Sequence, residues 1–215
     1  MVAGERGLDV PLLALGVAQA ANAGSLLLPT ANLTTLLALG PAPGGDGTYV
    51  RHVWVAWVLV AAATIAALTL LIARRPRSPR TIAGRWSPAR IGGDLLAMFL
   101  LASSIRATIP AGLSLGTGFW PAAVGASALA AAANNLPAAA AVHATTPAAT
   151  WGAVAGLAIG PNLLLTGSVA TVIVRRLTRE AGVHLSVWRF TLVGLTLVPI
   201  QLTAMYVGLR LTHAI

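Results

Sequence analysis

The chain has 215 residues, of which 57% are hydrophobic and only 9% charged, and arginine carries its net charge of +9. A soluble domain usually has about a quarter of its residues charged. The mean hydropathy of +0.81 therefore excludes an ordinary soluble protein and indicates an integral membrane protein. The absence of cysteine excludes a disulfide framework and a thiolate metal site.

The positions of the charges predict several membrane crossings. No formal charge falls in residues 10–45, and residues 107–174 are also free of charge. A helix of about 20 apolar residues crosses the hydrocarbon core. We expect spans at residues 53–73, 91–113, 151–174 and 190–209. The apolar N-terminus also imitates a secretory signal peptide, but it continues hydrophobic to Leu39, which is too long for an ordinary signal.

Two arginine-rich segments predict the orientation of these spans. Residues 74–90 contain six arginines and residues 175–180 contain three. Short basic loops beside transmembrane ends mark the cytoplasmic side, so we expect both to be cytoplasmic loops of a multi-pass plasma-membrane protein. Basic runs also occur in nucleic-acid-binding proteins, but the neighbouring apolar spans favour the topological interpretation, and no nucleic-acid partner is expected.

The region between the two basic segments predicts a hairpin within the membrane. If both basic segments are cytoplasmic, the chain between them crosses the membrane an even number of times. The spans 91–113 and 151–174 supply two crossings, so the stretch around Asn134, Asn135 and Pro137 must add zero or two. Its arms have about a dozen residues each, or about 18 Å as helices, short of the ~30 Å core. We expect a re-entrant hairpin whose tip asparagines satisfy freed backbone groups or coordinate a ligand. A Pro-kinked helix is the alternative.

The sequence contains a short internal repeat. SLLLPTANLTTLL (residues 25–37) and PNLLLTGSVATVI (residues 161–173) align without gaps, and each places a helix breaker beside small polar residues in an apolar segment. The predicted topology gives the two segments opposite directions across the membrane. Secondary transporters with inverted repeats have broken helices of this kind, which meet near the midplane at the substrate site.

The hairpin motif Asn-Asn-Leu-Pro followed by GPNLLLTGSVAT resembles the C-terminal half of the arsenical pump membrane protein (ArsB-type) family. This family is part of an ion-transporter superfamily that includes citrate transporters and divalent anion:sodium symporters. Residues 25–37 are similar to the discontinuous helix that ends the family's first half. Leu164 and Leu165 depart from the family pattern, where many members have Thr-Pro.

The resemblance implies an all-α polytopic membrane fold with discontinuous helices, a re-entrant hairpin and a partial inverted repeat. Residues 1–73 would end the first repeat, 74–90 would form the basic cytoplasmic loop, and 91–215 would form the second repeat. The family's first half contains a further hairpin that nothing in this chain matches. The chain is therefore expected to be a truncated gene product or the partner of a missing N-terminal half.

The resemblance also implies a polar pocket where the hairpin tip and both broken helices converge. Half-helix N-termini present partial positive charge to an anion, and freed carbonyls and hydroxyls suit a cation or a hydroxylated substrate. The candidate substrate- or ion-binding residues of the second half are Asn134, Asn135, Pro137, Gly160, Asn162, Thr166, Gly167, Ser168 and Thr171. Those of the first half are Asn32, Thr34 and Thr35. Asp94 is a candidate for proton coupling, with an interfacial role as the alternative.

We expect the chain to be a secondary active transporter or a truncated part of one. The favoured substrate is arsenite, antimonite or a related small inorganic ion. A carboxylate, citrate-type or other anion transporter is one alternative, and a non-transporting membrane fragment or subunit is another. No acid/base pair, nucleophile triad or metal cluster suggests an enzyme. We expect no cofactor beyond coupling to H⁺ or Na⁺. Expected partners are the lipid bilayer, the inorganic ion, a second copy or the missing half, and an ATPase.

Overall fold

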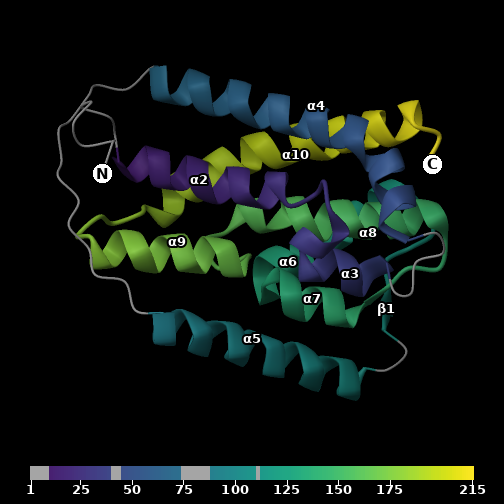
Figure 1. Ribbon diagram of the computed structural model, residues 1–215, viewed down its shortest axis with the longest axis horizontal. Coiled ribbons are helices and arrows are strands. Elements are labelled where there is room, and N and C mark those ends of the chain that lie inside the picture. Colours follow the sequence, from purple (N-terminus) through teal and green to yellow (C-terminus); the bar gives the residue numbers. More distant parts are fainter. Residues whose placement is uncertain (1–9, 40–44, 74–87, 110–111) are drawn as a thin grey trace.

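Helices form nearly all of the structure (Figure 1). The computed structural model describes residues 10–39, 45–73, 88–109 and 112–215. Within these residues there are nine α-helices, two short 3-10 helices and two strands of two residues each. The predicted all-α class is therefore confirmed for the described part of the chain.

The longest helices are α4 (Gly45–Ala73), α10 (Val187–Leu211) and α5 (Pro88–Thr108). Helix α4 packs along α10, and α5 flanks the opposite side of the molecule (Figure 1). The segments Gly47–Leu71 and Val187–Leu211 are long and apolar enough to cross a membrane, since 25 residues reach about 38 Å as a helix. These segments contain most of the first predicted span and all of the last one.

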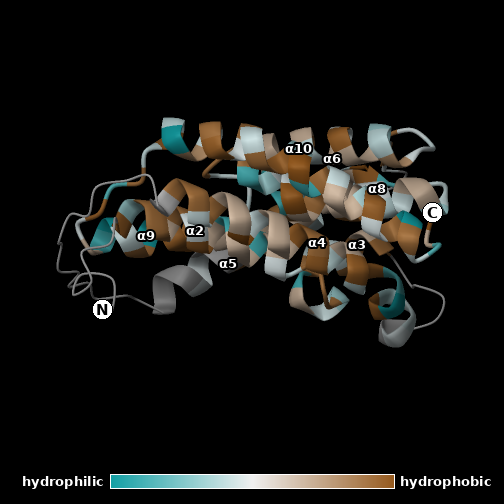
Figure 2. Cartoon of the chain, turned by 90° about the horizontal axis from the view of Figure 1, so that it is seen from above, coloured by the Kyte–Doolittle hydropathy of each residue, from teal (hydrophilic) through white to brown (hydrophobic). Residues whose placement is uncertain are grey.

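The exterior of these long helices is apolar. Large side chains such as Ile65 (65% exposed) and Leu195 (56% exposed) face outward, and Figure 2 shows apolar residues along most of α10. Soluble monomers rarely expose large contiguous apolar patches. The two long helices and their apolar exterior are the features expected of a chain associated with a membrane.

Both predicted helix breaks are present. After α2 (Val10–Gly24), a turn and a 3-10 helix, η1 (Pro29–Ala31), separate it from α3 (Leu33–Leu39). After α8 (Pro147–Ile159) the chain forms a second 3-10 helix, η2 (Gly160–Leu163), and then an extended turn before α9 (Val169–Glu180). Pro161 removes a backbone donor just after α8 and so prevents continuation of that α-helix, whereas Pro29 begins η1 after α2 has already ended at Gly24. The two broken helices run in opposite directions along the long axis (Figure 1).

A helical hairpin lies between α5 and α8. Helix α6 (Phe119–Ala133) is about 22 Å long and α7 (Asn135–Ala141) has seven residues. The parallel pairing of β1 (Leu113–Ser114) with β2 (Val142–His143) makes the hairpin begin and end at the same level.

The turn of the hairpin occurs at a single residue, Asn134, whose φ is 75°. Helix α7 is shorter than the arm of about a dozen residues expected from sequence. Pro137 lies at the third position of α7. A proline is tolerated there because the first N–H groups of a helix have no partner within the helix.

A close helix–helix contact fixes the hairpin against the second broken helix. Helix α6 packs along α8, and a Cβ added at Gly156 of α8 would lie 2.4 Å from the backbone oxygen of Ala123. Small residues at such contacts let two backbones approach closely. The hairpin is therefore held beside the α8–α9 break.

The predicted basic loop at residues 175–180 is wrong, because these residues form the last turns of α9. Arginine, leucine and glutamate have high helix propensity and continue the helix that Ser168 begins. Gly182, with φ of 72°, then ends it, and the N–H of Val183 donates to the oxygen of Thr178 at 2.7 Å. Of the other predicted basic loop, residues 74–87 lie outside the described residues and 88–90 begin α5.

Candidate functional site

A polar cavity of about 430 Å³ lies where the first helix break meets the hairpin tip and the start of α9. In the described part of the chain no charged side chain lines it. Its polar lining consists of amides and hydroxyls, contributed by Asn22, Ser25, Asn32, Thr34, Asn135 and Ser168. The cavity therefore offers neutral hydrogen-bonding groups and oxygen ligands.

The first wall of the cavity is a chain of hydrogen bonds across the break between α2 and α3. The Asn32 Oδ1 accepts from the Thr34 N–H at 3.1 Å and from the Thr34 hydroxyl at 2.6 Å. The Asn32 Nδ2 donates to the Ser25 Oγ at 3.2 Å, and the Ser25 hydroxyl donates to the oxygen of Asn22 at 2.8 Å. Asn32 thus caps the first turn of α3 and ties it to the end of α2.

The second wall is the tip of the hairpin, which is hydrogen-bonded to the break between α8 and α9. The Asn134 Nδ2 donates to the oxygen of Thr166 at 2.9 Å, and the backbone N–H of Asn135 donates to the oxygen of Gly167 at 2.8 Å. The Asn134 Oδ1 accepts from the N–H of Leu136 at 3.3 Å. Carbonyls freed by the break are therefore satisfied by the hairpin, while Asn135 lines the cavity.

The third wall is the N-terminus of α9. Its N-cap residue is Ser168, whose Oγ accepts from the N–H of Thr171 at 3.1 Å and lies 2.9 Å from the Thr171 Oγ1. Val169 and Ala170, in the first turn, also line the cavity. Unpaired N–H groups and the helix dipole place partial positive charge at this end.

A buried polar cluster adjoins the cavity through Asn22 and centres on Asn162, which is 0% exposed. The Asn22 Nδ2 donates to the Asn162 Oδ1 at 2.8 Å, and the Asn162 Nδ2 donates to the Gln201 Oε1 at 3.3 Å. The Gln19 Nε2 donates to the Asn162 oxygen at 3.0 Å, and the Gln201 Nε2 to the Thr64 Oγ1 at 2.8 Å. The cluster joins α2, α4, η2 and α10.

Five of the residues in these polar groups were not predicted as candidates: Gln19, Asn22, Ser25, Thr64 and Gln201. Gln19 and Asn22 lie in α2, Thr64 lies in α4 and Gln201 in α10, all of them apolar helices, and Ser25 follows the end of α2. Such a residue in a predicted span is itself a sequence signal, because polar groups within a membrane require a partner.

The structure brings four of the predicted site residues to the cavity and places the others around it. Asn32, Thr34, Asn135 and Ser168 line the cavity. The remaining predicted residues, which do not line it, are Thr35, Asn134, Pro137, Gly160, Asn162, Thr166, Gly167 and Thr171. Asp94 falls within α5, but its side chain lies outside the described residues.

Replacing Asn134 separates the role of its backbone from that of its side chain. Its φ of 75° and ψ of 147° lie in a region populated essentially by glycine, at a cost of about 1–3 kcal/mol for other residues. We expect Asn134→Gly to be more stable than Asn134→Ala by at least about 1 kcal/mol, because both lose the amide but only alanine retains the strain. Unfolding by SDS titration in detergent micelles measures the difference, and equal stabilities would contradict this geometry.

Comparisons of the chain with protein-family models, curated proteins and solved structures found no match. The resemblance to the arsenical pump membrane protein family therefore stays a prediction from the sequence motifs. The chemistry of the cavity follows from its own residues and geometry.

Proposed function

We propose that the chain is a secondary active membrane transporter, or part of one, that carries a small inorganic ion or its neutral hydroxide through the polar cavity. Arsenite and antimonite are the substrates that we favour. The proposal depends above all on one observation: both helix breaks and the hairpin tip meet at a single cavity whose polar lining groups are amides and hydroxyls beside small and aliphatic side chains. Broken helices that meet in this way are typical of transporter substrate sites.

The lining of the cavity favours a neutral hydroxylated substrate over a carboxylate. Arsenite at neutral pH is a trihydroxide, whose three hydroxyls both donate and accept hydrogen bonds. The amides of Asn22, Asn32 and Asn135 and the hydroxyls of Thr34 and Ser168 match this pattern. A di- or tricarboxylate needs cationic partners, and no described arginine lines the cavity.

The arrangement of the two broken helices suggests which parts move together. The hairpin tip is bonded to the α8–α9 break through the oxygens of Thr166 and Gly167, so hairpin and break form one wall. The end of α2, η1 and α3 form the facing wall. Alternating access by movement of one wall against the other exposes a fixed site to each side in turn. Coupling to H⁺ or Na⁺ would drive it.

Asn135→Ala and Ser168→Ala test the site. We expect each to lower the initial rate of arsenite transport into everted membrane vesicles at least about tenfold, which corresponds to a loss of about 1.4 kcal/mol of stabilisation. Asn135→Ala keeps the backbone hydrogen bond to Gly167, so the hairpin stays in place and only an amide in the cavity is lost.

Thr146→Ala is the matched control for Ser168→Ala. Thr146 caps α8 by accepting from the N–H of Ala149 at 3.1 Å, as Ser168 caps α9, but it does not line the cavity. We expect Thr146→Ala to transport at the wild-type rate. Wild-type transport in both Asn135→Ala and Ser168→Ala would show that the site is elsewhere. A wild-type chain that transports neither arsenite nor antimonite would favour a non-transporting subunit.

A further inference from the structure

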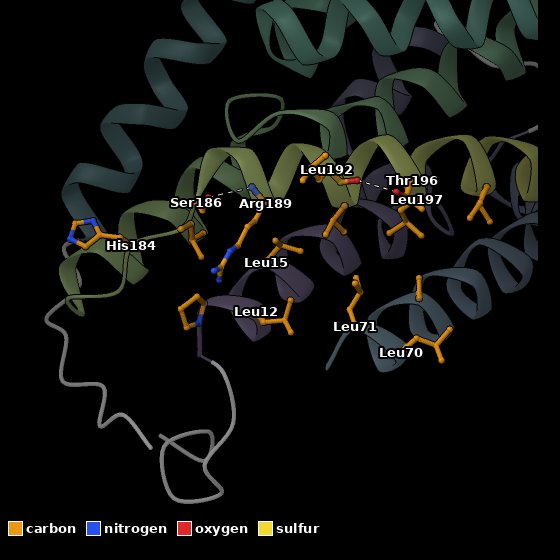
Figure 3. A pocket seen from close by; sticks show the side chains of 15 residues that line it. Leu12, Leu15, Leu70, Leu71, His184, Ser186, Arg189, Leu192, Thr196 and Leu197 are labelled. Carbon is orange, nitrogen blue, oxygen red and sulfur yellow. Dashed lines mark hydrogen bonds between the residues drawn. The ribbon is translucent and has the colours of Figure 1, made fainter. Parts of the chain in front are cut away.

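A second pocket, of about 550 Å³, lies between α2, α4 and α10 (Figure 3). It shares no lining residue with the polar cavity. Its walls are almost entirely aliphatic, with Leu12 and Leu15 from α2, Leu70 and Leu71 from α4, and Leu192 and Ile200 from α10. Its volume falls in the range of about 300–1,000 Å³ typical of ligand pockets. The transport site does not use these residues.

One end of this pocket is cationic. His184, Ser186 and Arg189 line that end, and the side chain of Arg189 extends from α10 towards α2 (Figure 3). Ser186 is also the N-cap of α10, a helix of 25 residues, so its first turn adds partial positive charge beside the guanidinium. No acidic residue lines the pocket in the part of the chain that the structure describes. The end of the pocket therefore suits an anionic group.

The pocket opens onto the apolar exterior. Leu70 is 58% exposed, Leu192 is 44% exposed and Ile200 is 49% exposed, so the aliphatic walls continue into the outer surfaces of α4 and α10. The cationic end lies where α9 ends and α10 begins (Figure 1). An aliphatic groove that leads from a basic end to an apolar surface matches a molecule with an anionic headgroup and a long hydrocarbon chain.

We propose that this pocket binds an anionic phospholipid, with one acyl chain along the leucines and the phosphate at Arg189 and the first turn of α10. The proposal depends on the membrane location proposed above, but not on transport. Basic pockets between transmembrane helices bind anionic headgroups in this way. A second copy of this chain is a poorer occupant, because its net charge of +9 would bring like charges together.

Native mass spectrometry of the full chain in detergent micelles tests the proposal, with dioleoyl phosphatidylglycerol and dioleoyl phosphatidylcholine as probes. We expect preferential retention of phosphatidylglycerol. Arg189→Gln is expected to weaken phosphatidylglycerol binding about fivefold, the loss expected for one arginine at a membrane surface. Arg210→Gln, at the exposed far end of α10, is the matched control and is expected to bind as the wild type does.

A second pair of variants tests the acyl-chain groove. Ala67→Phe fills the pocket, and we expect it to reduce retention of both lipids. Its control, Ala66→Phe, changes an exposed neighbour on α4 that does not line the pocket. Equal retention of the two lipids by the wild type, or wild-type binding by Arg189→Gln or Ala67→Phe, would overturn the proposal. Complete displacement by inorganic phosphate would also overturn it, because a free anion would then suffice.

The experiments distinguish failure of the lipid-site proposal from failure of the transport proposal. A chain that retains phosphatidylglycerol preferentially but transports no arsenite contradicts only the transport proposal. A chain that transports arsenite but shows no preference between the two lipids contradicts only the lipid site.

Discussion

Asn162→Leu is expected to lower the free energy of unfolding by about 3 kcal/mol, because it leaves the buried Gln201 Oε1 without its donor and leaves the Asn22 Nδ2 with only the Thr171 Oγ1, at 3.5 Å. Asn162 is fully buried, and its side chain accepts from Asn22 and donates to Gln201. Leucine has the same number of side-chain heavy atoms and the same branching at Cγ, so its methyl groups replace the amide oxygen and nitrogen and remove both hydrogen bonds. Unfolding by SDS titration in detergent micelles, followed by tryptophan fluorescence, measures the difference.

A control and a double-mutant cycle show whether the loss arises at the predicted contact. Thr203→Val, the control, removes a polar side-chain group from α10, but that hydroxyl is exposed and donates to the backbone oxygen of Pro199 in its own helix, so we expect almost no change. Asn22→Leu combined with Asn162→Leu should cost less than the sum of the single changes, because neither residue then leaves the other unpaired. Additive losses, or wild-type stability in Asn162→Leu, would refute the contact.

The helix breaks and the hairpin turn were predictable because local residues cause them. Pro161 follows the end of α8 and Pro29 begins the 3-10 helix after α2, and the turn of the hairpin falls at Asn134 of the Asn-Asn-Leu-Pro motif. Such effects act within a few residues and are visible in the sequence. The ends of the elements were less accurate, as the helical residues 175–180 illustrate.

The polar cluster was only partly predictable, because its partners lie far apart in the chain. Asn162 stands in a recognisable motif, but Gln19 and Asn22 are 143 and 140 residues from it. Gln201 bonds Thr64 across 137 residues. Helical periodicity identifies none of these pairs, since it reports on one helix at a time. The sequence motif therefore predicted the position of the helix break, whereas the long-range hydrogen bonds of the polar cluster could be identified only from the folded structure.

Gly194→Ala is expected to destabilise the protein by about 3 kcal/mol, the upper part of the range for overpacking a filled interior. A Cβ at Gly194 would lie 2.1 Å from the backbone oxygen of Asn162 and 2.9 Å from the Cα of Leu163. Both neighbours are backbone atoms, so no side chain can rotate away. Helix α10 or the 3-10 helix η2 must shift instead.

The shift gives Gly194→Ala a second expected effect, on transport, although Gly194 does not line the polar cavity. Moving Asn162 strains its hydrogen bond to Asn22, which does line the cavity, so we expect slower arsenite transport together with lower stability. Gly93→Ala in α5, an exposed position with no atom within 4 Å of the added Cβ, is the control and should be neutral or stabilising by up to about 1 kcal/mol. If Gly194→Ala unfolds at the same SDS fraction as Gly93→Ala, α10 does not pack on the break as described.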